Sequence, residues 1–246
     1  MNERELEIQA ASGAADAFFC HPDGQGPWPG VLLLTDIAGI RPAYRDRARR
    51  LAGLGYAVLA PNVFYRTGPP PVFDFKFVPG EERSMKRVGE LTAPVTPKAM
   101  ENDSSSYVDF LASCDVVGKG PMGVVGYCFT GAMAMRTAAV RADRIGAAAS
   151  FHGVRLYSDT GASPHLELPR IKARLYFGHA IKDNSMPEEA IEKLDRALEA
   201  WGGRYESEIY EGAYHGWTTP DGPVYNHGQA ERAFEKLTEL FAATLK

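Results

Sequence analysis

Residues 122–131 of the chain read MGVVGYCFTG. The first six form an uninterrupted run of apolar and small residues, which is typical of a strand buried on both faces of a sheet. Gly126 and Gly131 then flank Cys128 in the pattern G-x-C-x-x-G, where an Ala- and Met-rich helical pattern begins. Small residues at this spacing allow the sharp turn that raises a nucleophile above the carboxyl edge of a sheet. The alternative is that Cys128 is a small buried core residue, as free cysteines often are.

Further apolar runs on both sides of this stretch alternate with helical patterns. We expect strands over 5–10, 15–20, 30–34, 56–60, 122–127, 145–151, 173–178 and 205–210. We expect helices over 43–54, 97–113, 131–140, 187–201 and 229–245. Buried strands separated by helices form a mostly parallel central sheet with helices on both faces. Residues 1–246 are therefore predicted to form a single α/β domain.

Residues 66–97 interrupt this alternation. The run PPPVFDFKFVPG cannot form a regular core element, because three consecutive prolines remove backbone donors and fix φ. A short helix is expected only over 81–90. Long irregular segments in compact domains are more often functional lids than idle loops. We therefore interpret 66–97 as an irregular insertion or lid, and the alternative is a surface excursion without a role.

Composition argues against several classes of protein. The chain has 27 Lys and Arg against 31 Asp and Glu, a net charge of −4, so no nucleic-acid partner is expected. The three cysteines form no C-x-x-C pair, which argues against a zinc site or a redox dithiol and suits a reducing cytoplasm. No apolar signal segment and no run near 18 apolar residues is visible, so we expect a cytoplasmic protein without a membrane partner.

A candidate general base lies in the segment AYHGW, residues 213–217, between the last expected strand and the last expected helix. α/β-Hydrolases place nucleophile, acid and histidine in this order along the chain. His215 occupies the required position, whereas its nearest rival, His227, adjoins the closing helix. His152 follows the end of another strand and is expected near the pocket.

A candidate acid, Asp183, lies just past the expected strand 173–178, between nucleophile and histidine in sequence. A carboxylate there holds the imidazole tautomer and stabilises the imidazolium. The alternative role is the N-cap of the helix near Pro187, which suits Asn184 or Ser185 better. The three residues in this order predict an α/β-hydrolase fold with Cys128 as nucleophile, His215 as base and Asp183 as acid.

The segment LTDIAGI, residues 34–40, follows the expected strand 30–34, where this fold supplies a second oxyanion donor. We expect the amides of Ile37 and Phe129 to form the oxyanion hole. Asp36 is expected near the thiol, where a carboxylate could receive the thiol proton or repel a thiolate. The alternative is that Asp36 makes an ordinary turn. Tyr127, which precedes the nucleophile, is a further candidate for positioning substrate or thiol.

Together these segments resemble the dienelactone hydrolase (carboxymethylenebutenolidase) family of α/β-hydrolases. The matching pieces span most of the chain: TDIAGI, GYAVLAPNVFYR, GYCFTG, YFGHAIKD and GAYHGW. The resemblance implies a hydrolase without cofactors, often monomeric, that acts on cyclic enol esters such as dienelactone. It assigns the same roles to Cys128, His215 and Asp183. The expected partner is thus a small-molecule ester or lactone, and the expected assembly is a monomer or homodimer.

Two positions depart from the pattern of that family. Its members often carry Glu, which holds the resting thiol, in place of Asp36, and Gly in place of Thr130, whose bulk is expected to narrow the site. Its best-known members bind a substrate carboxylate through arginines. Arg66 and Arg83, both within 66–97, are the candidates in this chain.

Other functions remain open from the sequence. The same three residues would serve a general carboxylesterase or thioesterase without lactone preference. A catalytically silent α/β-hydrolase that binds a small ligand is a second alternative. A peroxide-sensing thiol is a third, although no resolving cysteine lies near Cys128 in sequence.

Overall fold

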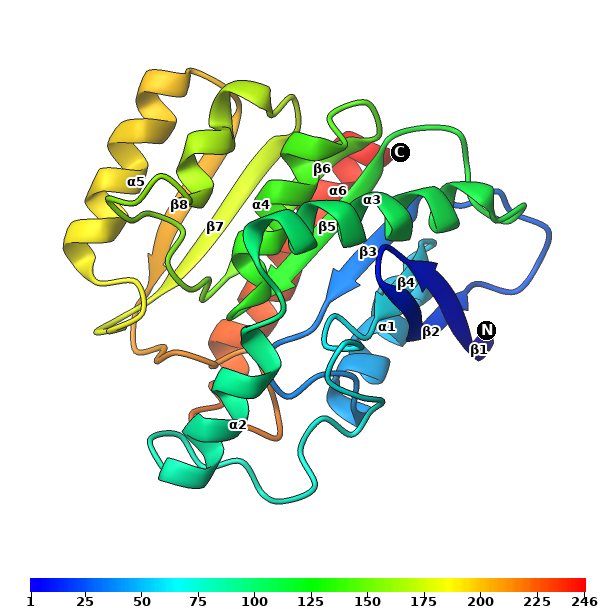
Figure 1. Cartoon of the computed structure of the whole chain (residues 1–246). Helices are drawn as coiled ribbons and strands as arrows, with labels where there is room; N and C mark the ends of the chain where they lie inside the picture. Colours follow the sequence, from blue (N-terminus) through cyan, green and yellow to red (C-terminus); the bar gives the residue numbers. More distant parts are fainter.

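The expected strands join into one eight-stranded sheet in the computed structural model, which describes all 246 residues (Figure 1). The order across the sheet is β1-β2-β4-β3-β5-β6-β7-β8, in which β1 and β2 form an antiparallel hairpin, β2 pairs antiparallel with β4, and the rest run parallel. The strands are β1 (Asn2–Ala10), β2 (Gly13–His21), β3 (Gly30–Leu34), β4 (Ala57–Pro61), β5 (Met122–Tyr127), β6 (Ile145–Phe151), β7 (Arg174–Ala180) and β8 (Tyr205–Tyr210).

The helices occupy the expected intervals between these strands. They are α1 (Pro42–Gly53), α2 (Glu82–Thr92), α3 (Pro97–Ser113), α4 (Thr130–Val140), α5 (Glu188–Trp201) and α6 (His227–Leu245). A 3₁₀ helix, η1 (Pro164–Arg170), lies between β6 and β7, in a stretch for which no element was predicted from the sequence. None of the helices combines the length and the apolar character that crossing a membrane requires.

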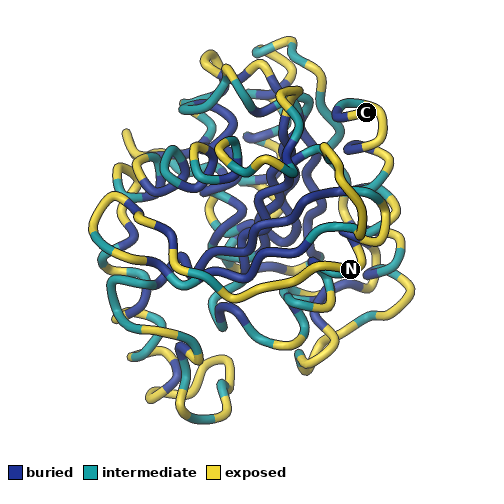
Figure 2. Tube along the Cα trace, turned by 90° about the vertical axis from the view of Figure 1, so that its right-hand side faces the viewer, coloured by how far each residue is buried: buried dark blue, intermediate teal, exposed yellow.

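The sheet separates two hydrophobic cores. One has 38 buried residues and includes Tyr107 and Leu111 of α3, Met133 of α4, and Leu194 of α5. The other has 28 and includes residues of α1 and α6, such as Phe241. Figure 2 shows the buried trace running through the middle of the molecule. Because both faces of the central strands are covered, their sequences are continuously apolar, as β3 and β5 show.

Parallel pairing brings the carboxyl ends of four strands to one edge of the sheet. Leu34 at the end of β3 is paired with Gly126 of β5, and Tyr127 is paired with Phe151 at the end of β6. Phe151 is paired in turn with Gly178 of β7. The loops that follow these strands carry the residues predicted to react. In open α/β sheets, ligands bind outside the carboxyl ends of the strands.

The segment 66–97 contains one full helix, α2, which projects from the body of the molecule (Figure 1). The helix covers 82–92 and is thus slightly longer than the expected 81–90. Val72, which is buried, anchors the irregular part, because a side chain on Gly39 would lie 3.0 Å from its Cγ2. Arg87 of α2 donates from Nε to the carbonyl of Val72 at 2.9 Å. The close approach of Val72 to Gly39 joins the segment to the loop that follows β3, and the bond from Arg87 holds α2 to Val72.

Candidate active site

Cys128 lies in a strained turn between β5 and α4. Its φ is 55°, a left-handed conformation that non-glycine residues rarely adopt. The turn is possible because its neighbours are small: a Cβ on Gly126 would lie 2.2 Å from the carbonyl oxygen of Thr130, and one on Gly131 would lie 2.3 Å from Ser150 Oγ. The geometry therefore has the features of the nucleophile elbow that the G-x-C-x-x-G pattern predicts.

Main-chain hydrogen bonds hold this turn in place. The Cys128 N–H donates to the carbonyl of Phe151 at 3.1 Å. The Cys128 carbonyl accepts from the amides of Gly131 and Val154, both at 3.1 Å. The elbow is thus joined to β6 on one side and to the start of its own helix on the other.

Thr130 does not face the site, so the expectation that its bulk narrows the site is wrong. Its side chain is fully buried beneath the elbow. The hydroxyl accepts from the Tyr127 N–H at 3.0 Å and lies 3.1 Å from the carbonyl oxygen of Leu34, to which it can donate. Thr130 therefore ties the turn that carries Cys128 to the end of β3.

The thiol, the imidazole and the carboxylate lie in one hydrogen-bonded line. His215 Nε2 is 3.1 Å from Cys128 Sγ, and His215 Nδ1 is 2.6 Å from Asp183 Oδ2. The three residues come from the ends of β5 and β7 and from the loop after β8. Asp183 is not a helix N-cap, because α5 begins at Glu188 with Pro187 in the cap position.

The electrostatics of this line favour a proton on the imidazole. Burial alone would lower the pKa of His215, but hydrogen bonds to Asp183 and Cys128 outweigh burial and raise the pKa to about 10. Burial on its own would raise the pKa of Asp183. The hydrogen bond from His215 is the largest of the opposing effects, and the pKa of Asp183 is lowered below its usual value. The arrangement therefore stabilises an imidazolium between a carboxylate and a sulfur.

Ser185 completes the acid side of this line, and the sequence did not point to that role. Its N–H and its hydroxyl both donate to Asp183 Oδ1, at 2.8 and 2.6 Å, and its Oγ lies 3.3 Å from His215 Nδ1. These bonds leave Oδ2 to the histidine and fix the rotamer of the carboxylate. A serine two residues after an aspartate is a common turn pattern, so the sequence gives little signal for it.

Both amides expected in the oxyanion hole are free. The Ile37 and Phe129 N–H groups donate no hydrogen bond to any acceptor in the protein. Phe129 follows Cys128 at the start of α4, and Ile37 lies in the loop after β3, which is paired with β5. Unpaired amides in the loops after β3 and β5 are available to an acceptor on a bound ligand.

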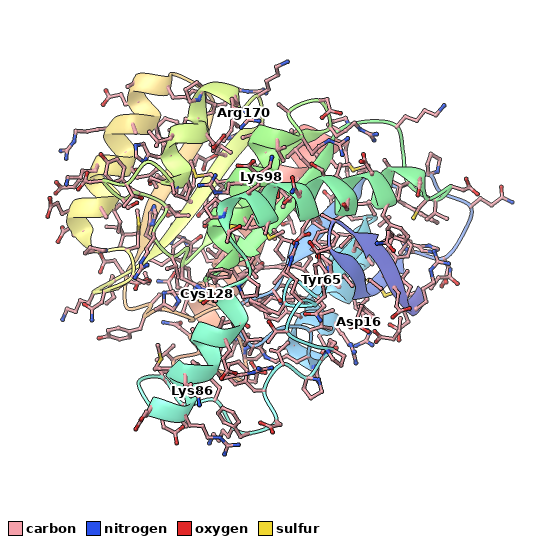
Figure 3. All side chains as sticks on the ribbon, viewed as in Figure 1. Asp16, Tyr65, Lys86, Lys98, Cys128 and Arg170 are labelled. Carbon is pink, nitrogen blue, oxygen red and sulfur yellow. The ribbon has the colours of Figure 1, made fainter.

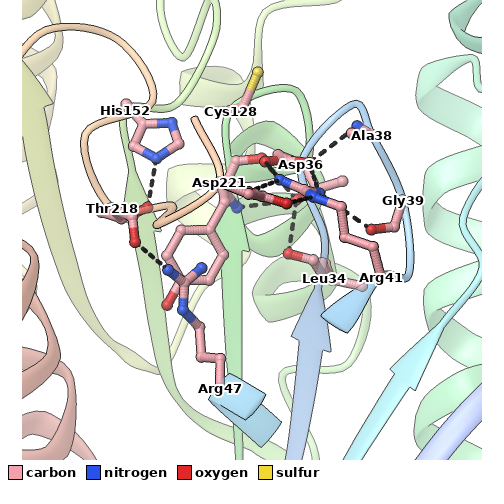
Figure 4. Close-up of polar contacts among 12 residues, drawn as sticks. Leu34, Asp36, Ala38, Gly39, Arg41, Arg47, Cys128, His152, Thr218 and Asp221 are labelled. Carbon is pink, nitrogen blue, oxygen red and sulfur yellow. Dashed lines mark hydrogen bonds and ion pairs between the residues drawn. The ribbon is translucent and has the colours of Figure 1, made fainter. Parts of the chain in front are cut away.

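Asp36 forms a bidentate ion pair with Arg41. Its Oδ1 and Oδ2 accept from Arg41 at 2.6 and 2.8 Å, and its Oδ1 also accepts from the Ala38 N–H at 2.9 Å. Arg41 continues to Asp221, at 2.7 Å from Nε, and so bridges the loop after β3 and the loop that carries His215. Figure 4 shows this cluster, with the sulfur of Cys128 pointing away from Asp36. The recorded contacts of Asp36 fit the turn interpretation and include no bond to the thiol.

The two candidate arginines of 66–97 have other partners. Arg66 forms two bonds to the buried carboxylate of Asp103, at 2.6 and 3.0 Å. Arg83, on α2, stacks over Phe75 with its guanidinium carbon 3.9 Å from the ring centroid, and its own side chain is largely exposed. Neither has a recorded contact with the residues of the hydrogen-bonded line, so we leave both out of the site.

Tyr127 and His152 differ in their relation to the site. Tyr127 is buried in the core, with its ring stacked on Phe151 and its face 4.2 Å from the guanidinium carbon of Arg47. His152 lies against His215, with ring centroids 5.1 Å apart. The structure therefore brings His152, and not the side chain of Tyr127, into contact with the reactive residues.

The remaining cysteines do not offer a rival nucleophile. Burial raises the pKa of Cys20 to about 12 and also raises the pKa of Cys114. Cys114 lines a cavity of about 540 Å³ between the β1–β2 hairpin and α3, and no residue of the hydrogen-bonded line contributes to this cavity. Figure 3 labels Cys128 on the ribbon, at the end of the molecule where α2 projects.

The fold and this constellation define the chain as an α/β-hydrolase. The sequence profile of the dienelactone hydrolase family matches residues 15–245. The chain therefore belongs to the dienelactone hydrolase family, whose members are hydrolases of ester bonds, and the resemblance drawn from the sequence is confirmed.

Individual relatives agree with this assignment. A Synechocystis protein with the provisional name carboxymethylenebutenolidase is 25% identical over 232 residues, covering 93% of this chain and 92% of the relative. A Rhodococcus opacus carboxymethylenebutenolidase is 27% identical over 224 residues, covering 86% and 79%.

Solved structures show the same fold. The structure of a provisionally named dienelactone hydrolase from Klebsiella pneumoniae superposes with a TM-score of 0.86 at 23% identity, over 98% of both chains. A Pyrococcus horikoshii acylaminoacyl peptidase superposes with a TM-score of 0.73 at 16% identity, over all of this chain and 42% of the peptidase. The predicted α/β-hydrolase fold is thus confirmed.

Proposed function

We propose that this chain is a cysteine-nucleophile hydrolase that cleaves an ester-type bond in a small molecule. Cys128 is the nucleophile, His215 the general base and Asp183 the acid that orients it. The observation that supports this most directly is the pair of contacts at 3.1 Å from sulfur to imidazole and 2.6 Å from imidazole to carboxylate. The raised pKa of His215 supports its role as the base that receives the thiol proton and becomes an imidazolium.

The first half-reaction transfers the acyl group to the enzyme. The sulfur of Cys128 attacks the ester carbonyl and forms a C–S bond, while the carbonyl oxygen becomes an oxyanion that the Ile37 and Phe129 amides receive. Each such donor supplies about 3 kcal/mol to the transition state. When the C–O bond breaks, the imidazolium of His215 gives its proton to the leaving oxygen. The product is a thioester on Cys128.

The second half-reaction releases the acid. Neutral His215 takes a proton from water, and the resulting hydroxide attacks the thioester through the same oxyanion hole. The C–S bond then breaks and the sulfur leaves as a thiolate beside the new imidazolium. One ester and one water are thus converted into one acid and one alcohol, and the enzyme returns to its starting state.

A lactone with an enolate leaving group suits this site best. An enolate needs little help from a proton donor when it leaves, so a thiolate can displace it readily. The relatives that carry the name carboxymethylenebutenolidase are similar to this chain over most of its length, which supports such a substrate. The alternative is a general carboxylesterase or thioesterase with no lactone preference.

The segment 66–97 acts in this proposal as the lid of the site. It reaches the oxyanion loop through the contact between Val72 and Gly39, and α2 stands at the same end of the molecule as Cys128 (Figure 3). A lid in this place would exclude water from the thioester until the leaving group has gone.

The decisive test is the substitution Cys128→Ala with p-nitrophenyl acetate as substrate. We expect turnover to fall to background, and we expect intact-protein mass spectrometry of the wild type to detect an acyl adduct on Cys128 under rapid quench. Cys114→Ala is the matched control and should retain full activity. Turnover by Cys128→Ala would remove Cys128 from the mechanism.

Two further experiments separate the alternatives. A panel of matched esters, thioesters and enol lactones distinguishes lactone preference from general esterase activity by the ratio of kcat/KM values. Iodoacetamide labelling at neutral pH tests the silent, ligand-binding alternative, because an inert Cys128 is expected only in that case.

A further inference from the structure

His152 is a buried imidazole beside the catalytic imidazole, and the steps above do not use it. It follows directly on β6, is 1% exposed and has a φ of 41°, which is again left-handed. Left-handed non-glycine residues persist where the surroundings fix them, and they concentrate at functional sites. The backbone at 152 is held by a bond from its N–H to the carbonyl of Gly178 at 2.8 Å.

The loop that carries the catalytic base encloses this ring. The ring of His215 packs edge-to-face on His152, with centroids 5.1 Å apart and planes at 66°. The ring of Trp217 packs on it in the same manner, at 5.0 Å and 70°. Thr218 Oγ1 lies 2.9 Å from His152 Nε2 (Figure 4). Three residues of one loop therefore contact the ring of His152, which lies directly after β6.

His152 is held in its neutral form. Burial, followed by the charges of His215 and Arg47, places its pKa well below the usual value. Arg47 is the fixed cation of this neighbourhood: its guanidinium lies over the rings of Tyr44 and Tyr127, and it donates to the carbonyl of Thr218 at 2.5 Å. His152 Nδ1 is buried without a hydrogen-bond partner. The ring therefore forms one hydrogen bond, between Nε2 and the Thr218 hydroxyl, and its other contacts are packing contacts.

We propose that His152 is a positioning residue that holds the ring of His215 in line between Cys128 and Asp183. Its neutral ring also provides an aromatic surface against which the imidazolium of His215 forms without repulsion. Asp183 and Ser185 hold the Nδ1 edge of the His215 ring by hydrogen bonds, and His152 limits the movement of that ring by packing against it. This inference rests on the proposed function, because the imidazolium arises in that mechanism.

The test is His152→Asn. Asn tolerates a left-handed backbone better than other residues but is too short to pack as a ring does. We expect kcat for p-nitrophenyl acetate to fall about 100-fold with KM nearly unchanged, because a misplacement of about 1 Å has this effect. We also expect the pKa of His215, followed by NMR in the substrate-free protein, to fall by about half a unit, the size of a weak cation–π contact.

Two variants separate positioning from a general structural role. His152→Phe keeps an uncharged ring but loses the bond to Thr218, so it should retain the pKa of His215 and reduce kcat only a few-fold. Thr218→Val keeps the ring and removes only the hydroxyl, so it should reduce kcat a few-fold with the pKa unchanged. The proposal is overturned if His152→Asn matches the wild type, or if it loses thermal stability and activity while the pKa of His215 stays the same. The NMR titration of His215 does not depend on turnover. Failure of the proposed reaction would be detected in a different experiment, the turnover assay of Cys128→Ala.

Discussion

Two carboxylates near the sheet edge are each paired with a cation, and the cations differ in what they can do. Asp183 holds His215, whose imidazolium can give up its proton. Asp36 holds Arg41, whose guanidinium cannot, since arginine stays charged at any pH that proteins experience. The first pair can therefore move protons during a reaction, whereas the second can only hold loops together. The same kind of ion pair is thus suited to proton transfer in one place and to holding loops together in another.

The largest expected effect comes from breaking the reactive pair. Asp183→Asn should leave the fold intact but reduce kcat by about 10⁴-fold, because the amide favours the wrong imidazole tautomer. Steady-state kinetics with p-nitrophenyl acetate measure the change, and circular dichroism checks the fold. A loss below tenfold would mean that Asp183 does not orient the base.

Breaking the architectural pair should reduce stability more than chemistry. In Arg41→Met the carboxylate of Asp36, which is 13% exposed, loses its cation. We expect the free energy of unfolding to fall by about 3 kcal/mol, as when one partner of a buried pair is removed. Urea denaturation measures this. The value of kcat should fall less than tenfold, and a loss as large as that of Asp183→Asn would place Asp36 in the chemistry.

Arg66 provides a matched control away from the reactive residues. Arg66→Met leaves the buried Asp103 unpaired and should destabilise the protein by a similar amount, about 3 kcal/mol. If Arg66 bound a substrate carboxylate, the variant would lose kcat/KM for esters that carry a carboxylate but not for neutral esters. We expect the ratio of kcat/KM for carboxylate-bearing esters to kcat/KM for neutral esters to be the same in Arg66→Met as in the wild type.

The reactive pair should also give stability a pH dependence that the architectural pair cannot give. The pKa of His215 is about 10 in the folded protein against 6.5 when unperturbed. The contribution of the His215 cation to the free energy of unfolding is therefore fully present below pH 6.5, declines as the pH rises, and is lost near pH 10. Comparing urea denaturation of the wild type and His215→Gln at pH 6 and pH 10 should show a loss of about 2 kcal/mol that only the wild type suffers, after allowance for solvent screening. Parallel losses in both proteins would show that His215 is not stabilised as a cation.

The smallest effect is expected at the outer end of the Arg41 cluster. Asp221 is about half exposed, and its pair with Arg41 is screened by solvent. Asp221→Asn should therefore change the free energy of unfolding by less than about 1 kcal/mol. A loss comparable to that of Arg41→Met would show that the link between the two loops, and not the bond to Asp36, carries the stability.

The sequence predicted the features that depend on local patterns. Strand 30–34 was predicted with the bounds of β3, and the positions of Cys128, Asp183 and His215 follow from strands that end just before them. Each strand end could be read from a few neighbouring residues. Because parallel strands end at one edge, the three side chains had to be close once the order of the elements was known.

The features that sequence reasoning missed depend on partners far apart in the chain. Asp221 is 180 residues from Arg41, and Asp103 is 37 residues from Arg66. Both arginines could be located in the sequence, but their partners could not, because charged residues are common and a pattern does not specify which of them will meet. The inward turn of Thr130 was missed for a related reason, since its acceptor is on β3, 96 residues away.

The elbow has a consequence for how exchangeable the reactive atom is. The hydrogen bonds that shape the turn at residue 128 come from main-chain atoms and from the Thr130 hydroxyl, and the one hydrogen bond of the sulfur goes to the imidazole of His215. A hydroxyl could therefore occupy the same place without disturbing the frame, and Cys128→Ser would convert the site from thiol to alcohol chemistry on an unchanged scaffold. Under the proposed function, the shape of the reaction centre is thus independent of the element that reacts there, and a single substitution would exchange sulfur for oxygen.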